Sequence, residues 1–312
     1  MTPPKNLFRS GPRFRTGLRF KIYQVAVESF IINLLNGLSW GMLLFLISVG
    51  LTTVFGVLGV LNFAHGSLFM LGAYLCMQMM HVVPSFWIGL IFGPLMVALL
   101  GVVIERLLLR RIYGRDITFQ LLLTFAILLI LDDAVRIIWG PGYHVVDPPA
   151  LLSGVFSIFS RTYPIYRVFL IVAGPLIGLS LWSFFQLTRW GKIIRAAAVD
   201  REMAEGIGIR VPILFTAVFG LGAWLAAVGG ALAAPQQSLA PSMGERIIIE
   251  SFIVVVSGGM GSFPGAFAGA LILGLLESFG TVFLGSAQMA VPYILLVTVL
   301  LIRPHGFFGR EV

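Results

Sequence analysis

A long stretch without charge sets the class of fold that this chain can adopt. No Asp, Glu, Lys or Arg occurs between Ser29 and Ile104. A helix that crosses a bilayer needs roughly 20 apolar residues, so this stretch alone is long enough for about three crossings. Charged residues make up only 11% of the chain, against about 25% in an ordinary soluble domain. The sequence therefore predicts an all-α polytopic membrane protein.

Basic residues cluster in the N-terminal region and in two connections between apolar segments. The net charge of +8 is therefore not spread over a surface that could bind nucleic acid. Lys and Arg that gather in tails and short loops follow the rule by which positive charge stays in the cytoplasm. On that rule, residues 1–28 are a basic cytoplasmic tail, residues 29–303 form the transmembrane domain, and residues 304–312 are a second cytoplasmic tail. The connections 105–116 and 188–210 are placed on the same side.

Candidate membrane-spanning segments occur near residues 30–58, 66–81, 86–104, 117–138, 166–187, 211–234, 247–262, 265–284 and 287–302. We expect about eight complete crossings, with broken or re-entrant pieces between them. Three segments separate the basic tail from connection 105–116, although an even number is required if both are cytoplasmic. Either one segment is re-entrant, or the first is broken into more pieces, or the N-terminus lies outside despite its charge. We favour a break around Asn62–Gly66, and we place the polar connection 140–163 outside.

Two glycine-rich interruptions, at Gly56–Tyr74 and at Ser257–Gly274, lie within the apolar segments. Irregular backbone at membrane depth persists only where protein or a water-filled cavity covers it, and paired breaks in the two halves of a transporter indicate a substrate path. The alternative is that the glycines let helices pack closely. The first break also carries polar residues, so we predict a mainly apolar substrate path beside Asn62, His65 and Gly66.

Three ionisable positions within the apolar segments are candidates for function or for pairing. Glu277 has no partner nearby in the sequence, so it either faces a wet pathway or pairs with another helix, and we add it to the predicted substrate path. Glu250 lies one helical turn after Arg246, a spacing typical of an ion pair. Asp132 and Arg136 have the same spacing.

Three motifs resemble those of the branched-chain amino acid ABC-transporter permeases. Within that family, they resemble the first of the two permease subunits. They are GLTTVFGVLGVLNFAHGSLFMLGAY (Gly50–Tyr74), RAAAVDREMAEGIGI (Arg195–Ile209) and GGMGSFPGAFAGALILG (Gly258–Gly274). The match spans residues 30–305, in the family's order. It implies an ABC importer permease fold in the bacterial inner membrane, surrounded by lipid. It also implies three kinds of partner: a second permease subunit, two cytoplasmic ATP-binding subunits and an extracytoplasmic solute-binding protein.

A charged, helix-prone segment at 192–210 lies between two long apolar segments. Its alanines favour a helix, and Gly206 and Gly208 are placed to end it. Because this many charged side chains cannot lie in hydrocarbon, we predict that the segment lies at the water interface. The resemblance implies that this segment couples the permease to its ATPase. The coupling residues that it implies are Arg195, Ala196, Asp200, Ala204, Gly208 and Ile209.

The resemblance implies transport of branched-chain, hydrophobic amino acids. The chain has no G-x-x-x-x-G-K-[ST] phosphate loop, so ATP hydrolysis would belong to other subunits. It also has no G-x-S-x-G or HExxH motif, and its histidines are scattered, so we predict neither an enzyme nor a metal site or cofactor. A permease for urea or short amides uses nearly the same motifs. An ion-coupled secondary transporter is a further alternative.

Overall fold

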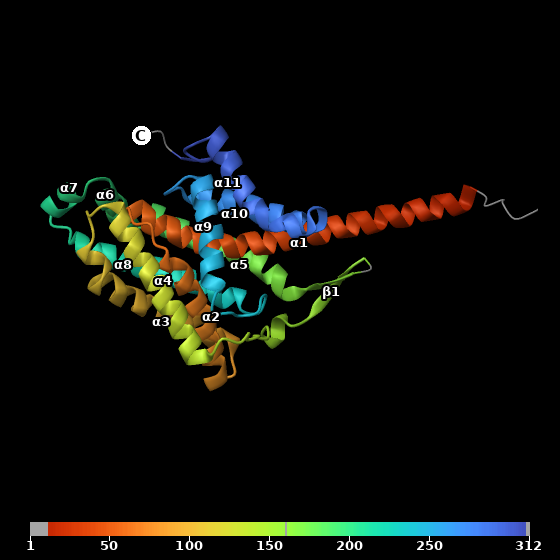
Figure 1. The fold of residues 1–312 in the computed structure, drawn as a ribbon, viewed down its shortest axis with the longest axis horizontal. Coiled ribbons are helices and arrows are strands. Elements are labelled where there is room, and N and C mark those ends of the chain that lie inside the picture. The colour runs from red at the N-terminus through yellow and green to blue at the C-terminus, as the bar shows by residue number, and fades with distance from the viewer. Residues whose placement is uncertain (1–11, 160, 310–312) are drawn as a thin grey trace, which may run out of the picture.

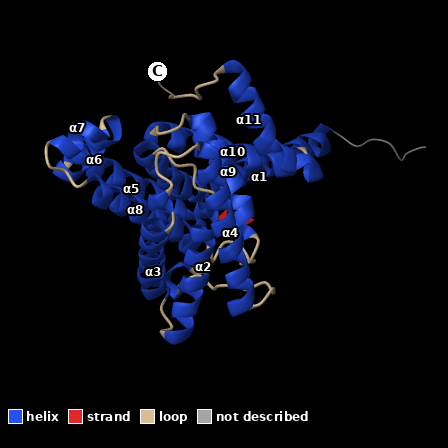
Figure 2. Cartoon of the chain, turned by 60° about the vertical axis from the view of Figure 1, so that its left-hand side comes forward, coloured by secondary structure: helices blue, strands red, loops and turns tan. Residues whose placement is uncertain are grey.

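The computed structural model describes residues 12–159 and 161–309, and most of this part is helical (Figure 1, Figure 2). The first part of the predicted tail lies outside the described residues, and from Pro12 the tail is the beginning of the first helix. The α-helices are α1 (Pro12–Leu58), α2 (Ala64–Val82), α3 (Phe86–Leu107), α4 (Ile117–Trp139), α5 (Ile165–Leu187), α6 (Arg189–Val199), α7 (Arg201–Gly206), α8 (Val211–Ala233), α9 (Met243–Gly258), α10 (Phe263–Phe283) and α11 (Val291–Ile302). The connections contain an antiparallel hairpin of β1 (Val155–Ile158) and β2 (Arg161–Pro164), and 3-10 turns at Leu109–Arg111, Ala150–Leu152 and Gly285–Ala290.

Within the described residues, 6 segments are long and apolar enough to cross a membrane. They are Gln24–Leu58, Phe86–Arg111, Ile165–Leu187, Val211–Ala233, Phe263–Phe283 and Gly285–Ile302. Helices α2, α4 and α9 pack among them, and α9 has only 16 residues. α8 is central, with 72% of its apolar window buried, whereas only 11% is buried in the last segment. The polytopic helical fold is confirmed, with 6 candidate spans and three further helices packed among them.

Close contacts of small residues hold α1 against α10 in antiparallel orientation. A Cβ atom on Gly37 would lie 2.8 Å from the Cα atom of Leu275, and one on Gly41 would lie 2.9 Å from the carbonyl oxygen of Ala270. Farther along, the ring of Phe45 lies edge-on to Phe267, with 5.1 Å between centroids. Because hydrocarbon does not drive apolar helices together, such close backbone approach is how membrane helices gain contact.

The two ends of the bundle differ, and α1 connects them. We call the end that carries α6 and α7 the α6–α7 end, and the end that carries β1 and β2 the hairpin end (Figure 1). Midway along α1, Asn36 accepts a hydrogen bond from Arg167, which lies in the first turn of α5 directly after the hairpin. At the C-terminal end of α1, Val57 and Leu58 pack with Ile194 of α6. α1 therefore runs from the hairpin end to the α6–α7 end.

This direction resolves the parity of the first half of the chain. α1, α2 and α3 make three passes between the two ends, so the described start of α1 lies opposite connection 105–116. The last described residues lie at the α6–α7 end, where Phe307 donates a 2.8 Å backbone hydrogen bond to Ser257 at the end of α9. The described part of the chain therefore begins and finishes at opposite ends of the bundle, and the side of the membrane that each tail occupies stays a prediction. Since α1 is a single helix of 47 residues, the alternative that the first apolar segment is broken into more pieces is wrong.

Both predicted interruptions are breaks between helices, at narrower positions than the motifs suggested. Residues 59–63 separate α1 from α2, so His65 and Gly66 already belong to the first turn of α2. Residues 259–262 separate α9 from α10, and Gly259 and Gly261 have φ angles of 103° and 79°. Residues other than glycine rarely adopt that region, which explains the glycines of the second motif.

Candidate functional site

The segment predicted as one charged helix forms two helices, α6 and α7, that meet at Asp200. The backbone of Asp200 is extended, and its carboxylate accepts a 2.9 Å hydrogen bond from the backbone N–H of Met203. Asp200 thus ends α6 and caps α7, and capping by an Asp side chain stabilises a helix start. Gly208 follows α7 with a φ angle of 90°, which confirms that it ends the segment.

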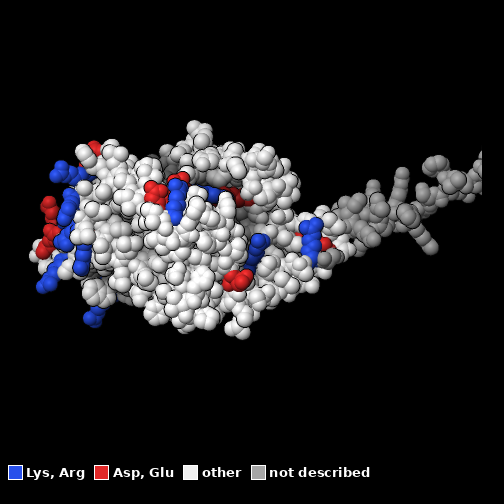
Figure 3. Space-filling view, turned by 60° about the horizontal axis from the view of Figure 1, so that its bottom comes forward, with Lys and Arg blue, Asp and Glu red and all other residues white. Residues whose placement is uncertain are grey.

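The two helices bury one face and expose the other. Ile194, Ala197 and Ala204 pack against α8. Of the implied coupling residues, Arg195, Ala196, Asp200 and Gly208 are exposed, Ile209 is half-buried, and Ala204 is buried. Figure 3 shows charged side chains gathered at this left-hand end, while most of the same face is free of charge.

Sequence reasoning missed an apolar stripe on the exposed face. Val199, Met203 and Ile207 are 89%, 67% and 73% exposed. Val199 is the last residue of α6, Met203 lies in α7 and Ile207 follows α7, so the three side chains belong to the exposed surface of the segment but not to one helix. Their pattern could have been read from the sequence, but the surrounding charges drew attention to the polar residues instead. Exposed apolar side chains that adjoin one another are typical of a surface that binds another protein.

A buried carboxylate fixes the base of α6 and α7. Glu105 of α3 is fully buried and accepts hydrogen bonds from Thr216 (2.6 Å) and from the Tyr113 hydroxyl (3.0 Å). Burial, reinforced by the Glu105 charge, raises the pKa of Tyr113, so its hydroxyl keeps the proton that it donates. The Arg201 guanidinium lies 5.5 Å from the ring centroid of Phe215 next to this network. These contacts tie α3 and α8 together directly beneath α7.

The polar residues of the first break lie in the protein interior. Asn62 and His65 are fully buried, and the His65 Nε2 atom is 3.1 Å from the carbonyl oxygen of Ile47. Neither polar atom of the Asn62 amide has a hydrogen-bond partner among the described residues. A Cβ atom on Gly66 would lie 2.2 Å from the Gly244 carbonyl oxygen, so α2 and α9 touch there. The predicted substrate path beside this break stays a prediction.

Glu277 lies apart from that break, at a cavity near the hairpin end. Its carboxylate accepts a 2.6 Å hydrogen bond from the indole Nε1 of Trp40 on α1. It also lines a cavity of about 320 Å³ together with Arg167 and Arg246. Of the two alternatives left open for Glu277, pairing with another helix is confirmed by the Trp40 contact, and a place on a wet pathway stays a prediction.

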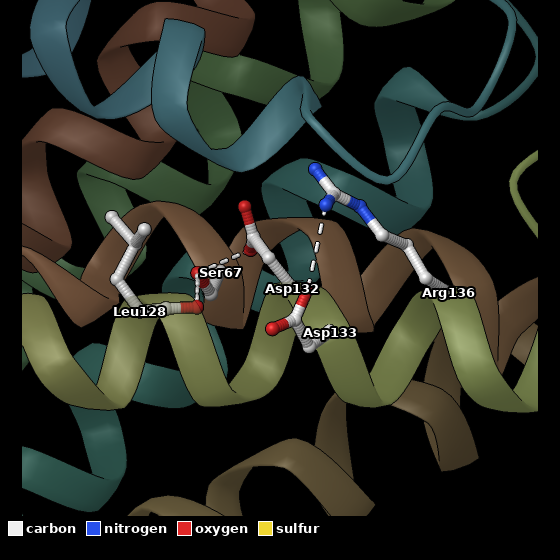
Figure 4. A network of polar contacts seen from close by, with 5 residues as sticks. All are labelled: Ser67, Leu128, Asp132, Asp133 and Arg136. Atoms are coloured by element: carbon white, nitrogen blue, oxygen red, sulfur yellow. Dashed lines mark hydrogen bonds and ion pairs between the residues drawn. The ribbon is translucent and has the colours of Figure 1, made fainter.

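The two predicted ion pairs have different outcomes. Arg246 donates a 2.8 Å hydrogen bond to Glu250, as expected. The pair of Asp132 with Arg136 is wrong: Arg136 pairs with Asp133 at 3.4 Å, whereas Asp132 accepts a 2.8 Å hydrogen bond from the Ser67 hydroxyl (Figure 4). Asp132 faces α2 and is buried, whereas Asp133 and Arg136 share the exposed side of α4. Tertiary packing, not spacing, selected the partner.

No cluster of three or more His, Cys, Asp or Glu side chains that could hold a metal ion occurs in the described ranges. Besides the buried groups around Glu105, Asn62 and Asp132, polar groups gather on the exposed α6–α7 surface and in the cavity near the hairpin end. This arrangement suits binding and movement of a solute.

Comparison with known proteins agrees with the motifs. Residues 33–300 match the family described as the permease component of branched-chain amino acid transport systems. The chain is 32% identical over 300 residues to the high-affinity branched-chain amino acid transport system permease protein BraD of Pseudomonas aeruginosa, covering 91% of this chain and 97% of that protein. It is 30% identical over 297 residues to LivH of Escherichia coli, covering 90% and 96%.

A solved structure, PsaBC from Streptococcus pneumoniae in complex with Fab, aligns with a TM-score of 0.46 and 14% sequence identity, covering 86% of this chain and 89% of that one. The family match and the two relatives extend over nearly the whole transmembrane part of the chain. The chain belongs to the permease-component family of branched-chain amino acid transport systems.

Proposed function

We propose that this chain is the membrane permease subunit of an ATP-driven importer that carries branched-chain amino acids across the bacterial inner membrane. The relatives are named for that transport, and they match nearly their full length. ATP hydrolysis would occur on two separate cytoplasmic subunits, and a second permease subunit would complete the membrane part.

The observation that carries the proposal is the exposed face of α6 and α7. A stripe of Val199, Met203 and Ile207 lies at the water interface and is flanked by charged residues. Apolar side chains in that setting gain free energy when a partner covers them. Arg195, Asp200 and Gly208, which the resemblance assigns to coupling, border the stripe. An ATPase that binds this stripe could move α6 and α7, and through their buried face move α8.

This assignment also orients the bundle. If α6 and α7 are cytoplasmic, the hairpin end and its cavity face the extracytoplasmic side, where a solute-binding protein would deliver its solute. The start of α1 then lies outside, and the C-terminal end of the chain lies in the cytoplasm. The transmembrane domain would still comprise residues 29–303, with 192–210 as the coupling segment.

The test is uptake by the complete complex with its ATPase subunits and binding protein. We expect import of labelled leucine, driven by ATP, and no import of urea. Import of urea in place of leucine would favour the amide-permease alternative. Leucine uptake driven by an ion gradient without ATP would favour a secondary transporter.

A substitution tests the docking surface itself. Met203→Arg places a charge in the stripe, so we expect ATPase subunits to be lost during purification and uptake to fall by about tenfold or more. The matched control is Met289→Arg, because Met289 is also exposed (85%, against 67% for Met203) but follows α10 at the hairpin end. That control should retain the ATPase subunits. Normal uptake by the Met203→Arg complex would contradict the docking assignment.

A further inference from the structure

The cavity near the hairpin end is polar, although it lies between apolar helices. Its walls come from α1, α5, α9, α10 and the residues that follow α8. Its volume of about 320 Å³ falls within the range of roughly 300–1,000 Å³ typical of small-molecule sites. Burying polar groups between apolar helices costs free energy, so their presence here indicates a ligand site or a pathway.

The floor of the cavity is closed toward the α6–α7 end. Gly274 of α10 lines the cavity and touches α1, since a Cβ atom on Gly274 would lie 2.5 Å from the Gly37 carbonyl oxygen. Below this contact, Phe45 packs edge-on against Phe263 and Phe267, with centroids 5.6 and 5.1 Å apart. A solute that entered from the hairpin end would therefore stop beside Gly274 until α1 and α10 separate.

The acidic wall of the cavity is Glu277. Its side chain is only 6% exposed, and one carboxylate oxygen is held by Trp40 at 2.6 Å. Among the described residues no ion pair involves this carboxylate. An indole N–H stabilises a carboxylate only in part, so an added cation would gain a favourable contact here.

The basic wall is formed by two arginines. Arg167 is half-buried, and the side chain of Asn36 orients its guanidinium. Arg246 uses its Nε atom to hold Glu250 at 2.8 Å, while 70% of its side chain stays exposed. A guanidinium has five N–H donors, so the remaining donors of each arginine can bind a carboxylate.

We propose that this cavity receives the head group of a zwitterionic α-amino acid. The Glu277 carboxylate faces the ammonium group, and the guanidinium groups of Arg167 and Arg246 face the carboxylate. Trp40 and Gly274 provide the less polar wall for the side chain. The inference rests on the proposed function and adds to it a selectivity step within the permease, after the solute leaves its binding protein.

The charges distinguish this ligand from neutral solutes. A urea or amide molecule could form hydrogen bonds in the cavity but would leave the Glu277 charge uncompensated. An amine without a carboxylate would place a third cation beside the two arginines. Only a zwitterion matches both walls, because it brings one charge of each sign and adds no net charge. The competing explanation is that Glu277 and the arginines only stabilise helix packing.

The experiment measures occupancy of the cavity directly. Thr281 is exposed and lines the cavity, so Thr281→Cys introduces a thiol there, while the native Cys76 is buried. The assembled transporter complex, without binding protein, is treated with a hydrophilic thiol reagent in the presence of increasing leucine. We expect leucine to slow the modification. Urea, isoamylamine and 4-methylpentanoate, which lack one or both charges of leucine, should not slow it.

The variants test each wall. We expect Glu277→Gln and Arg246→Gln each to raise the leucine concentration that halves the rate of thiol modification by about tenfold or more. Each variant loses a hydrogen bond to a charged group of leucine, and a loss of that size follows. Glu277→Asp, which keeps the charge, should retain part of the protection. The matched control is Glu105→Gln, which removes another buried carboxylate at the far end of the bundle and should leave protection unchanged. Size-exclusion profiles establish that each variant assembles.

The outcomes separate this inference from the proposed function. If the wild-type complex imports leucine but leucine does not protect the thiol, the inference is overturned and the proposed function stands. The same holds if leucine protects the thiol in the Glu277→Gln and Arg246→Gln variants as well as it does in the wild type. Equal protection by urea would also overturn it. If leucine protects the thiol but the complete complex does not import leucine, the cavity binds the zwitterion and the proposed function fails.

Discussion

The α6–α7 end and the cavity near the hairpin end are built in opposite ways. α6 and α7 come from one continuous stretch, and their caps, Thr188 and Asp200, bind backbone N–H groups three residues away. The cavity joins residues far apart in the chain, such as Trp40 and Glu277. A local structure can be moved as a unit by a partner. A site assembled from several helices opens or closes when those helices shift.

The two regions also differ in which side chains they expose and which they bury. At the α6–α7 end, apolar side chains such as Val199 are exposed among charges. At the cavity, a charged side chain, Glu277, is buried among apolar helices. Each is unfavourable in the isolated chain and becomes favourable when a complement binds, a protein surface in the first case and a charged solute in the second.

The largest expected effect tests whether the two ends lie on opposite sides of the membrane. Val25 and Ile207 are both exposed, at the hairpin end and the α6–α7 end respectively. An impermeant thiol reagent added to intact cells should label Val25→Cys and leave Ile207→Cys unlabelled. Permeabilised cells that lack the ATPase subunits should show labelling of both. Labelling of Ile207→Cys from outside would reverse the orientation proposed for the bundle.

The next prediction concerns the core that both ends share. A Cβ atom on Gly230 of α8 would lie 1.9 Å from the Phe69 carbonyl oxygen of α2. Relieving this overlap would require the backbone of α2 or α8 to move, at a large cost in free energy. We expect Gly230→Val to prevent assembly, so that detergent-solubilised protein elutes as aggregate. The matched control is Gly206→Val, because a Cβ atom at Gly206 meets nothing within 4 Å. A monodisperse Gly230→Val complex would show that the two ends do not depend on this contact.

The same contrast between local and assembled structure explains which features could be predicted from the sequence. The absence of charge and the glycines predicted the helices and the positions of both breaks, because these depend on neighbouring residues. The charged segment and its stop at Gly208 were also visible. The partner of Asp132 was not, since Ser67 lies on another helix. Nor was the cavity, because nothing local to Glu277 indicates that Arg167 and Arg246 line the same space.

A smaller effect on stability, with a clear effect on transport, is expected at the first break. Because the Asn62 amide lacks partners among the described residues, Asn62→Leu removes no hydrogen bond there and should leave the melting temperature nearly unchanged. If the substrate path passes beside this break when the helices move, uptake falls by about tenfold or more while ATPase stimulation persists. Asn62→Asp, which adds a buried charge, should instead destabilise the protein. Uptake at the wild-type rate by Asn62→Leu would remove Asn62 from the path.

The smallest expected effect separates charge from capping on the α6–α7 surface. Asp200 has two possible roles, as an acidic group that a partner recognises and as the cap of α7. Asp200→Asn removes the charge and keeps an oxygen that can accept the Met203 N–H, whereas Asp200→Ala removes both. Loss of a cap costs about 1 kcal/mol of helix stability, enough to unfold a six-residue helix such as α7 part of the time. If the cap matters, Asp200→Ala lowers uptake several-fold and Asp200→Asn leaves it near wild type. The measurement is leucine uptake alongside hydrogen exchange of residues 201–206, which should quicken only in Asp200→Ala. Equal loss of uptake in both variants, with unchanged exchange, would assign Asp200 to direct recognition by the partner and would make the α6–α7 surface more polar in its binding than its apolar stripe suggests.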